Sequence, residues 1–238
     1  MTEKAKLLLA MGVYVVLSLG IFFVLDISES MQFILFIILL ATLSLIKRLI
    51  KKRRGVITMI KGKFVYLRPI KDEDTESIFQ SCQDEDIMYM TGTRKQFKLD
   101  EIINAYKQYR VDSTRYDFAI CLLDNDQIIG DLSILEIDQD NHKAGFRISL
   151  HSQNTTSKGY GTEATKLAQK FAFEVLKLNR LELEVFSHNI RGIKAYGKAG
   201  FKIEGILRQA HHINQTYSDE IIMGILKEEY SKSNLYNM

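Results

Sequence analysis

The segment Thr155–Gly161 (TTSKGYG) joins a predicted strand to a predicted helix and contains two glycines. Glycines let a backbone approach a ligand closely, and the first N–H groups of a helix lie at the positive end of its dipole. The segment could therefore bind an anion, although the glycine pattern by itself favours a purely structural turn. The helix after it has one apolar face, made of Ala164, Leu167, Ala168, Phe171, Ala172, Val175 and Leu176.

This loop matches neither of two common nucleotide motifs. GxxxxGK[ST] is absent, and GxGxxG fails because residue 164 is alanine and no acidic residue ends the next strand in the usual way. Pyrophosphate binding by another fold stays open.

A second candidate segment, residues 188–201 (HNIRGIKAYGKAGF), places Asn189 at a strand end and Tyr196 in a short helix. A well-placed phenol with a pKa of about 10 can donate a proton to a thiolate of pKa about 8.5. The structural alternatives are a half-buried aromatic for Tyr196 and a helix N-cap for Asn189.

The elements that would position these residues follow from alternation and turn signals. Strands at 116–123, 127–137 and 143–150, joined by short polar turns, predict an antiparallel meander. Residues 84–99 read as irregular. The other predicted elements are strands at 64–68, 180–185 and 221–226, a further strand after Phe201, a loop around Ser218 and Asp219, and helices at 72–83 and 99–111.

The charge of this 238-residue chain is unevenly distributed. The formal net charge is +3, but residues 47–54 (KRLIKKRR) carry six basic and no acidic side chains, while residues 55–238 are nearly neutral. A basic surface for nucleic acid is therefore excluded as the main interpretation, and no direct nucleic-acid partner is expected.

Two apolar runs precede this basic collar. Residues 7–25 contain no charge, and residues 31–46 form a second run that extends to 50 if Lys47 and Arg48 reach the membrane surface. We expect a transmembrane helical hairpin with the lipid bilayer as partner. A cleaved signal peptide or a buried core helix is the alternative. Basic residues outside both spans predict a two-span protein of the cell membrane, with both termini and residues 55–238 in the cytoplasm.

Cysteines and histidines suggest no metal site. Cys82 and Cys121 are far apart, without a CxxC pattern, and read as reduced core thiols. His188 reads as a polar strand end, and His211 with His212 as part of an exposed loop, without a third clustered ligand.

The two candidate segments carry a resemblance to a known family. Residues 157–164 (SKGYGTEA) and the pattern N-x5-AY-x-K-x-GF beginning at Asn189 resemble the signature regions of GNAT-superfamily N-acetyltransferases, more narrowly the ribosomal-protein-alanine acetyltransferase type. The match covers about residues 60–230, from YLRP (66–69) to MGILKEE (223–229), in the family's order.

The resemblance implies an α+β fold, a GNAT-like mixed and mostly antiparallel sheet flanked by helices, here preceded by the two-helix hairpin. The expected domains are residues 1–54, the hairpin with its basic collar, and 55–238, the acetyltransferase domain. The implied co-substrate is acetyl-CoA, in a cleft where two central strands splay, and no metal is implied. The residues implied to bind acetyl-CoA are Ile148, Leu150, Lys158, Gly159, Tyr160, Gly161, Thr162 and Asn189, with Tyr196 as the catalytic acid.

The sequence departs from the family pattern at two places. Thr156 stands where the family usually has Gln or Arg, three positions before the first loop glycine. Lys143 and Ala144 lie on the strand where many relatives carry a glutamate base. Glu136, Asp138 and His151 remain as candidate bases, and each could equally be a surface residue.

The sequence thus predicts a membrane-anchored enzyme that transfers an acetyl group from acetyl-CoA to a primary amine, with a peptide or protein N-terminus as the favoured acceptor by resemblance. Two alternatives remain. One is an acetyltransferase for a small amine, a polyamine or an amino-sugar antibiotic. The other is a non-catalytic acyl-CoA-binding membrane sensor.

Overall fold

The computed structural model of this chain describes residues 37, 38, 42 and 59–235. The chain divides into two compact units, Met1–Ile57 and Thr58–Met238. Residues 37, 38 and 42 are helical, and the rest of the predicted spans 7–25 and 31–50 lies outside the described residues. Within the described ranges, no helix combines the length and the apolar sequence that crossing a membrane requires.

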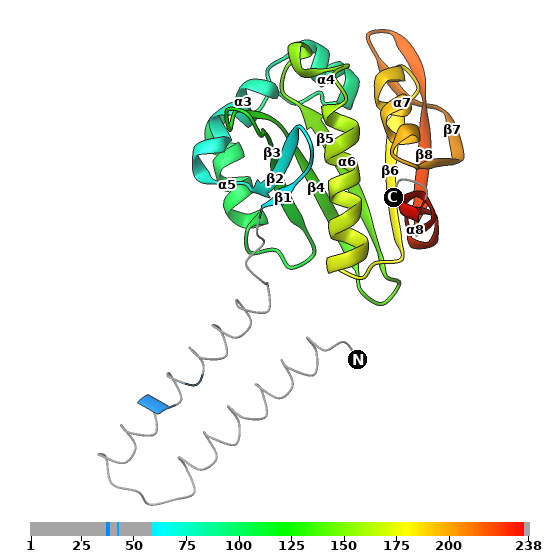
Figure 1. The fold of residues 1–238 in the computed structure, drawn as a ribbon. Coiled ribbons are helices and arrows are strands. Elements are labelled where there is room, and N and C mark those ends of the chain that lie inside the picture. The colour runs from blue at the N-terminus through cyan, green and yellow to red at the C-terminus, as the bar shows by residue number, and fades with distance from the viewer. Residues whose placement is uncertain (1–36, 39–41, 43–58, 236–238) are drawn as a thin grey trace, which may run out of the picture. The chain divides into compact units, whose positions relative to one another are not determined.

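The second unit is built on one eight-stranded sheet with the order β1-β2-β3-β4-β5-β6-β8-β7 (Figure 1). Its strands are β1 (Ile60–Lys61), β2 (Val65–Pro69), β3 (Tyr116–Leu122), β4 (Ile128–Asp138), β5 (Lys143–Leu150), β6 (Arg180–Phe186), β7 (Lys202–Ile213) and β8 (Thr216–Leu226). Every neighbouring pair is antiparallel except β5 and β6, which run parallel. The predicted meander of β3, β4 and β5 is confirmed, as is the mixed, mostly antiparallel sheet.

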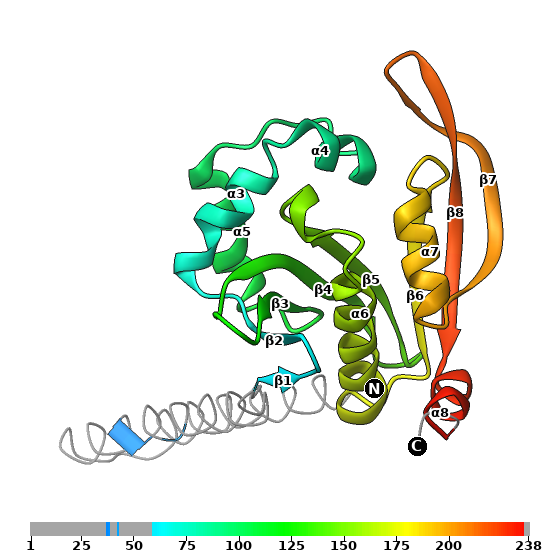
Figure 2. The same ribbon diagram turned by 45° about the horizontal axis from the view of Figure 1, so that its top comes forward.

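Helices cover both faces of this sheet. They are α3 (Thr75–Ser81), α4 (Glu85–Thr91), α5 (Leu99–Tyr109), α6 (Tyr160–Lys170), α7 (Ile190–Lys198) and α8 (Lys227–Leu235), with 3₁₀ turns η1 (Asp72–Asp74) and η2 (Gln153–Thr155) and a π-helical turn η3 (Phe171–Val175). Figure 2 shows the β7–β8 hairpin at one edge of the sheet, beyond α7.

Neighbouring residues of β3 show how the two faces are filled, because successive side chains of a strand point to opposite faces. Phe118 packs edge-on against Phe171, at the end of α6, with ring centroids 5.1 Å apart. Ala119 belongs instead to a buried cluster that includes Ile78 of α3 and Ile102 of α5. The α6 face and the α3/α5 face of the sheet therefore have separate cores.

The structure differs from the sequence-based prediction in three elements. Residues 84–99 are not wholly irregular: Asp84 caps α4 by accepting a hydrogen bond from the Ile87 N–H (3.0 Å), and Gly92 ends that helix at φ 68°. The predicted loop around Ser218 is part of β8. The predicted apolar helix face ends early, because the π-helical turn shifts the helical phase and leaves Val175 62% exposed.

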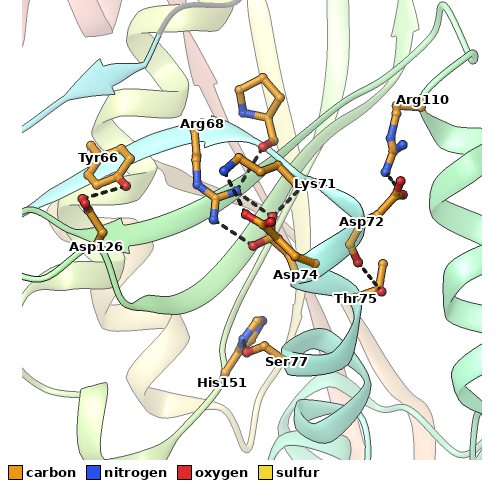
Figure 3. Close-up of polar contacts among 12 residues, drawn as sticks. Tyr66, Arg68, Lys71, Asp72, Asp74, Thr75, Ser77, Arg110, Asp126 and His151 are labelled. Carbon is orange, nitrogen blue, oxygen red and sulfur yellow. Dashed lines mark hydrogen bonds and ion pairs between the residues drawn. The ribbon is translucent and has the colours of Figure 1, made fainter.

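A buried ion pair fixes the entry to α3 (Figure 3). Both guanidinium nitrogens of Arg68 donate to the carboxylate of Asp74, at 2.6 and 2.8 Å, and the Lys71 N–H donates to the same carboxylate at 2.7 Å. Asp74 is buried, so the pair anchors the helix start to β2.

Candidate active site

The site begins where β5 and β6 separate. Their pairing is limited to three residues at the start of each strand, Lys143–Gly145 with Arg180–Glu182. Farther along β5 lies a cleft of about 360 Å³, lined by residues of α4, the end of β5, η2, the start of α6 and α7. The parallel pair thus splays open as the resemblance implies.

The end of β5 exposes main-chain groups toward this opening. The His151 N–H donates to the Ile129 carbonyl at 2.8 Å, and alternate residues of an antiparallel strand turn their N–H and C=O groups to opposite edges. His151 and Ser149 therefore face β4. Ile148 and Leu150 direct their main-chain groups to the edge that β6 has left, and both residues line the cleft.

The loop before α6 has the geometry that anion binding needs. Gly159 precedes the helix at φ 87°, a conformation that residues with a Cβ rarely adopt. The Glu163 N–H is the donor to the Gly159 carbonyl (3.0 Å), so the N–H groups of residues 160–162 come before the first helical bond. Gly159, Gly161 and Thr162 line the cleft.

Two of the predicted loop residues lie outside the cleft lining. Lys158 is exposed on the loop. The ring of Tyr160 is tilted against Phe64, with centroids 6.5 Å apart. Neither side chain borders the cleft, so the contact with acetyl-CoA predicted for these two residues would involve their main chain.

Asn189 joins α7 to α4 while lining the cleft. Its Oδ1 accepts from the Gly192 N–H (2.9 Å) as the N-cap of α7, and its Nδ2 donates to the Met90 carbonyl (3.3 Å). The N-cap alternative is therefore observed, and it is compatible with a ligand-binding role because the residue also borders the cleft.

Tyr196 lines the cleft from α7 and is half-buried. Burial raises the pKa of its phenol to about 12. Among the described residues, none hydrogen-bonds to its hydroxyl. A phenol with this pKa keeps its proton at neutral pH and can act only as a donor toward a thiolate.

The three candidate bases differ sharply in position. Glu136 and Asp138 lie at the β4 irregularity opposite Lys143, at the far end of β5 from the cleft, about 16 Å along the strand. Neither lines the cleft. Lys143, on the strand where the resemblance implied a glutamate in many relatives, is paired with Glu182.

His151 lies at the cleft end of β5, but its imidazole is nearly buried. Its Nε2 is 2.9 Å from Asp131 Oδ1, and its Nδ1 is 3.0 Å from Ser77 Oγ on α3. Figure 3 shows His151 beside Ser77. The side chain of His151 is 7% exposed and does not line the cleft. Ser77 does not line the cleft either, so neither residue of this pair borders the site directly.

Of the predictions made for the other histidines, the one for His211 was wrong. His188 is half-buried at the end of β6, with Nδ1 2.8 Å from Ser218 Oγ and Nε2 2.9 Å from the Tyr89 carbonyl. His211 is not in an exposed loop: it is a buried residue of β7 stacked on Phe186 at 4.0 Å. Over the described ranges, no three His, Cys, Asp or Glu side chains cluster as metal ligands.

Several polar residues that line the cleft were not predicted from the sequence, among them Asp86 on α4, Gln153 on η2 and Arg191 on α7. Arg191 lies two residues after Asn189, so its place in that segment was a usable signal. The sequence carried no comparable signal for Asp86, because the helix that holds it was not predicted.

A family model described as an acetyltransferase (GNAT) domain matches residues 65–202. The chain belongs to the GNAT acetyltransferases. Probable N-acetyltransferase YjcK of Bacillus subtilis is 29% identical to it over 184 residues, covering 72% of this chain and 98% of the relative. Spermidine N(1)-acetyltransferase of Escherichia coli K12 is 30% identical over 167 residues, covering 70% and 88%.

The fold of this GNAT chain is also that of a solved relative. The crystal structure of spermidine N-acetyltransferase from Vibrio cholerae in complex with CoA and spermine superposes with a TM-score of 0.65, at 24% identity, covering 70% of this chain and 98% of that one. The protein is thus an N-acetyltransferase with acetyl-CoA as co-substrate. The open glycine loop and the free edge of β5 beside the cleft fit that co-substrate.

Proposed function

We propose that this acetyltransferase acts on a small primary amine of the polyamine class. The observation that carries the proposal is the similarity to spermidine N(1)-acetyltransferase, which extends over 88% of that relative. This favours the small-amine alternative over the peptide or ribosomal-protein N-terminus suggested by the sequence resemblance.

Carboxylates on the α4 face of the sheet support a cationic acceptor. Phe186 lies on this face, because a Cβ added to Gly92 at the end of α4 would meet its ring. Glu220 is directly opposite Phe186 across the β6–β8 ladder, and Glu184 is two residues away on β6, so both share that face. A hydrogen bond to Glu220 raises the pKa of the Glu184 carboxyl.

One basic residue of the neighbouring strand already has a carboxylate partner of its own. Lys143, on the neighbouring strand, is already paired with Glu182. Arg147 is exposed on β5, and Asp86 adds a carboxylate to the cleft lining itself. Two close carboxylates disfavour each other's ionised form, and an ammonium group bound beside them would relieve that repulsion.

The proposed reaction is direct transfer within a ternary complex. The acceptor nitrogen attacks the thioester carbonyl, the new C–N bond forms and the C–S bond breaks. A main-chain N–H at the end of β5, from Ile148 or Leu150, stabilises the carbonyl oxygen, an effect of about 2.7–4 kcal/mol in enzymes where it has been removed. Tyr196 protonates the departing sulfur, the amine proton leaves to water, and a proton from solvent restores the Tyr196 phenol.

The test is a thiol-release assay with the full chain in detergent micelles, acetyl-CoA and a panel of amines. Spermidine and spermine should be turned over with the highest kcat/KM, ahead of peptides with free N-termini and of aminoglycosides. The E184Q/E220Q double variant should raise KM for spermidine about tenfold or more and change kcat little, while E136Q, at the far end of β5, serves as the matched control.

Other outcomes decide between the alternatives. Turnover of peptides alone would overturn the small-amine proposal and restore the peptide acceptor. Binding of CoA without turnover of any amine would favour the acyl-CoA sensor.

We also propose that residues 1–54 anchor the enzyme in the cell membrane, with the catalytic unit cytoplasmic. The support is the sequence itself: the uncharged run 7–25, the run 31–50 and the collar 47–54. The full chain should stay with the membrane fraction in alkaline carbonate and be released by detergent. Release by carbonate alone would contradict the anchor.

A further inference from the structure

Three exposed side chains form a hydrogen-bonded chain across the cleft. Arg191 Nη1 on α7 donates to Gln153 Oε1 on η2 at 2.6 Å, and Gln153 Nε2 donates to Asp86 Oδ2 on α4 at 3.1 Å. All three residues line the cleft. The guanidinium of Arg191 is therefore held at the opening by a neutral partner.

Arg191 is part of a cationic side of the cleft. Lys194 and Lys198 follow it at helical spacing on α7, and both also line the cleft. Within the described part of the chain, no carboxylate forms an ion pair with Arg191. Its positive charge is thus available to an anionic ligand.

Arg191 lies beside the residue at which the loop before α6 differs from the family pattern. Thr156 occupies the place where the family usually carries Gln or Arg. Arg191 Nη1 lies 3.4 Å from the Thr156 Oγ1, reaching the same place from another helix. A guanidinium presents paired N–H donors that suit phosphate oxygens.

We propose that Arg191 binds the pyrophosphate of CoA, replacing the side chain that Thr156 lacks, and that Gln153 holds Arg191 when no co-substrate is bound. Both partners are exposed, so the contact can exchange for a charge-assisted hydrogen bond, which is stronger than a neutral one. The inference concerns the co-substrate and does not depend on which amine is acetylated.

The test is CoA binding to the full chain in detergent, measured by isothermal titration calorimetry without any acceptor. R191A should weaken CoA about tenfold or more, as expected for the loss of a hydrogen bond to a charged group. Introducing T156R into R191A should restore most of the affinity. R208A, which removes an exposed arginine of β7 outside the cleft lining, is the matched control.

Dephospho-CoA, which lacks the 3′-phosphate of CoA but keeps the pyrophosphate, shows which of these groups Arg191 contacts. If Arg191 binds the pyrophosphate, R191A weakens CoA and dephospho-CoA by the same factor. A loss confined to CoA would assign Arg191 to the 3′-phosphate and overturn the proposal, as would unchanged binding of both. Thermal unfolding of R191A should match the parent chain, so that lost binding is not lost folding.

Gln153 is tested separately. Q153A should tighten CoA about twofold to fivefold, because the competing partner of Arg191 is gone. An unchanged affinity would remove Gln153 from the exchange. A loss as large as that of R191A would show that Gln153 itself contacts CoA.

Discussion

The ring of Tyr196 meets the ring of Phe146 edge-on, with centroids 6.4 Å apart. Phe146 lies on β5 two residues before Ile148, so this contact sets the position of the α7 tyrosine relative to the strand whose free edge borders the cleft. A second edge contact, to Phe201 at 6.1 Å, holds the ring from the residue just before β7. The aromatic packing and the hydroxyl can therefore be separated experimentally.

The first prediction concerns Y196F, which keeps these ring contacts and removes the hydroxyl. The kcat should fall about 10²- to 10⁴-fold, the range for loss of a general acid, while CoA affinity and thermal stability stay near those of the parent chain. Steady-state kinetics and calorimetry with CoA measure the two effects. An unchanged kcat would exclude Tyr196 from proton transfer.

The pH dependence gives an independent check on the same residue. Because burial raises the pKa of Tyr196 to about 12, the phenol stays protonated well above its ordinary range. The rate of the parent chain should therefore show no loss attributable to this group between pH 8 and about 10. A tyrosine-dependent decline in that interval, absent in Y196F, would contradict the protonated acid.

The second prediction compares two glycines of α7. A Cβ at Gly192 would lie 2.9 Å from the Asn189 side chain, whereas a Cβ at Gly197 would meet nothing within 4 Å. G192A should displace Asn189 and weaken CoA binding, while G197A should stabilise the helix by about 0.5–1 kcal/mol. Thermal unfolding and CoA titration measure the two effects. If both variants behaved alike, the predicted difference between the two glycines would be wrong.

The third prediction separates the two contacts of Asn189. N189A loses the N-cap and should destabilise the protein by about 1 kcal/mol. N189D keeps the oxygen that accepts from the Gly192 N–H but removes the donor to the Met90 carbonyl. N189D should therefore unfold at a higher temperature than N189A. Equal unfolding temperatures would show that the N-cap hydrogen bond contributes no measurable stability.

Much of the fold was accessible from sequence because its elements follow local rules. β5 has the predicted bounds, Lys143–Leu150, since its flanking turns and its alternation are strong. α4 was missed because its seven residues, Glu85–Thr91, are fewer than the window over which a helical period can be recognised. Its only sequence signals were the caps, Asp84 and Gly92.

The site was predictable only where it follows from chain order. The glycine loop, Asn189 and Tyr196 lie in continuous segments, and the structure brings them to one cleft. Contacts between distant segments were not accessible. The spacing of residues along the chain says nothing about Arg191 meeting Gln153, 38 residues away, or about His151 being enclosed by Asp131 and Ser77.

The last prediction concerns the buried pair that anchors α3. Burial alone would raise the pKa of the Asp74 carboxyl, but the hydrogen bonds from Arg68 and from the Lys71 N–H outweigh burial and lower it. A carboxyl whose pKa is lower in the folded state stabilises the protein above its unfolded pKa of about 3.9, and that stability is lost as the pH falls through the folded pKa. D74N leaves Arg68, whose side chain is 15% exposed, without its charged partner and should cost about 3–5 kcal/mol at pH 7. The difference in the free energy of unfolding between the parent chain and D74N should stay constant above about pH 5 and shrink on acidification below about pH 4, as measured by urea unfolding.

D72N is the matched control, because Asp72 pairs with Arg110 on the surface and its loss should change stability little. A D74N difference that did not shrink in acid would mean that the contribution of Asp74 comes from its shape and not from its charge.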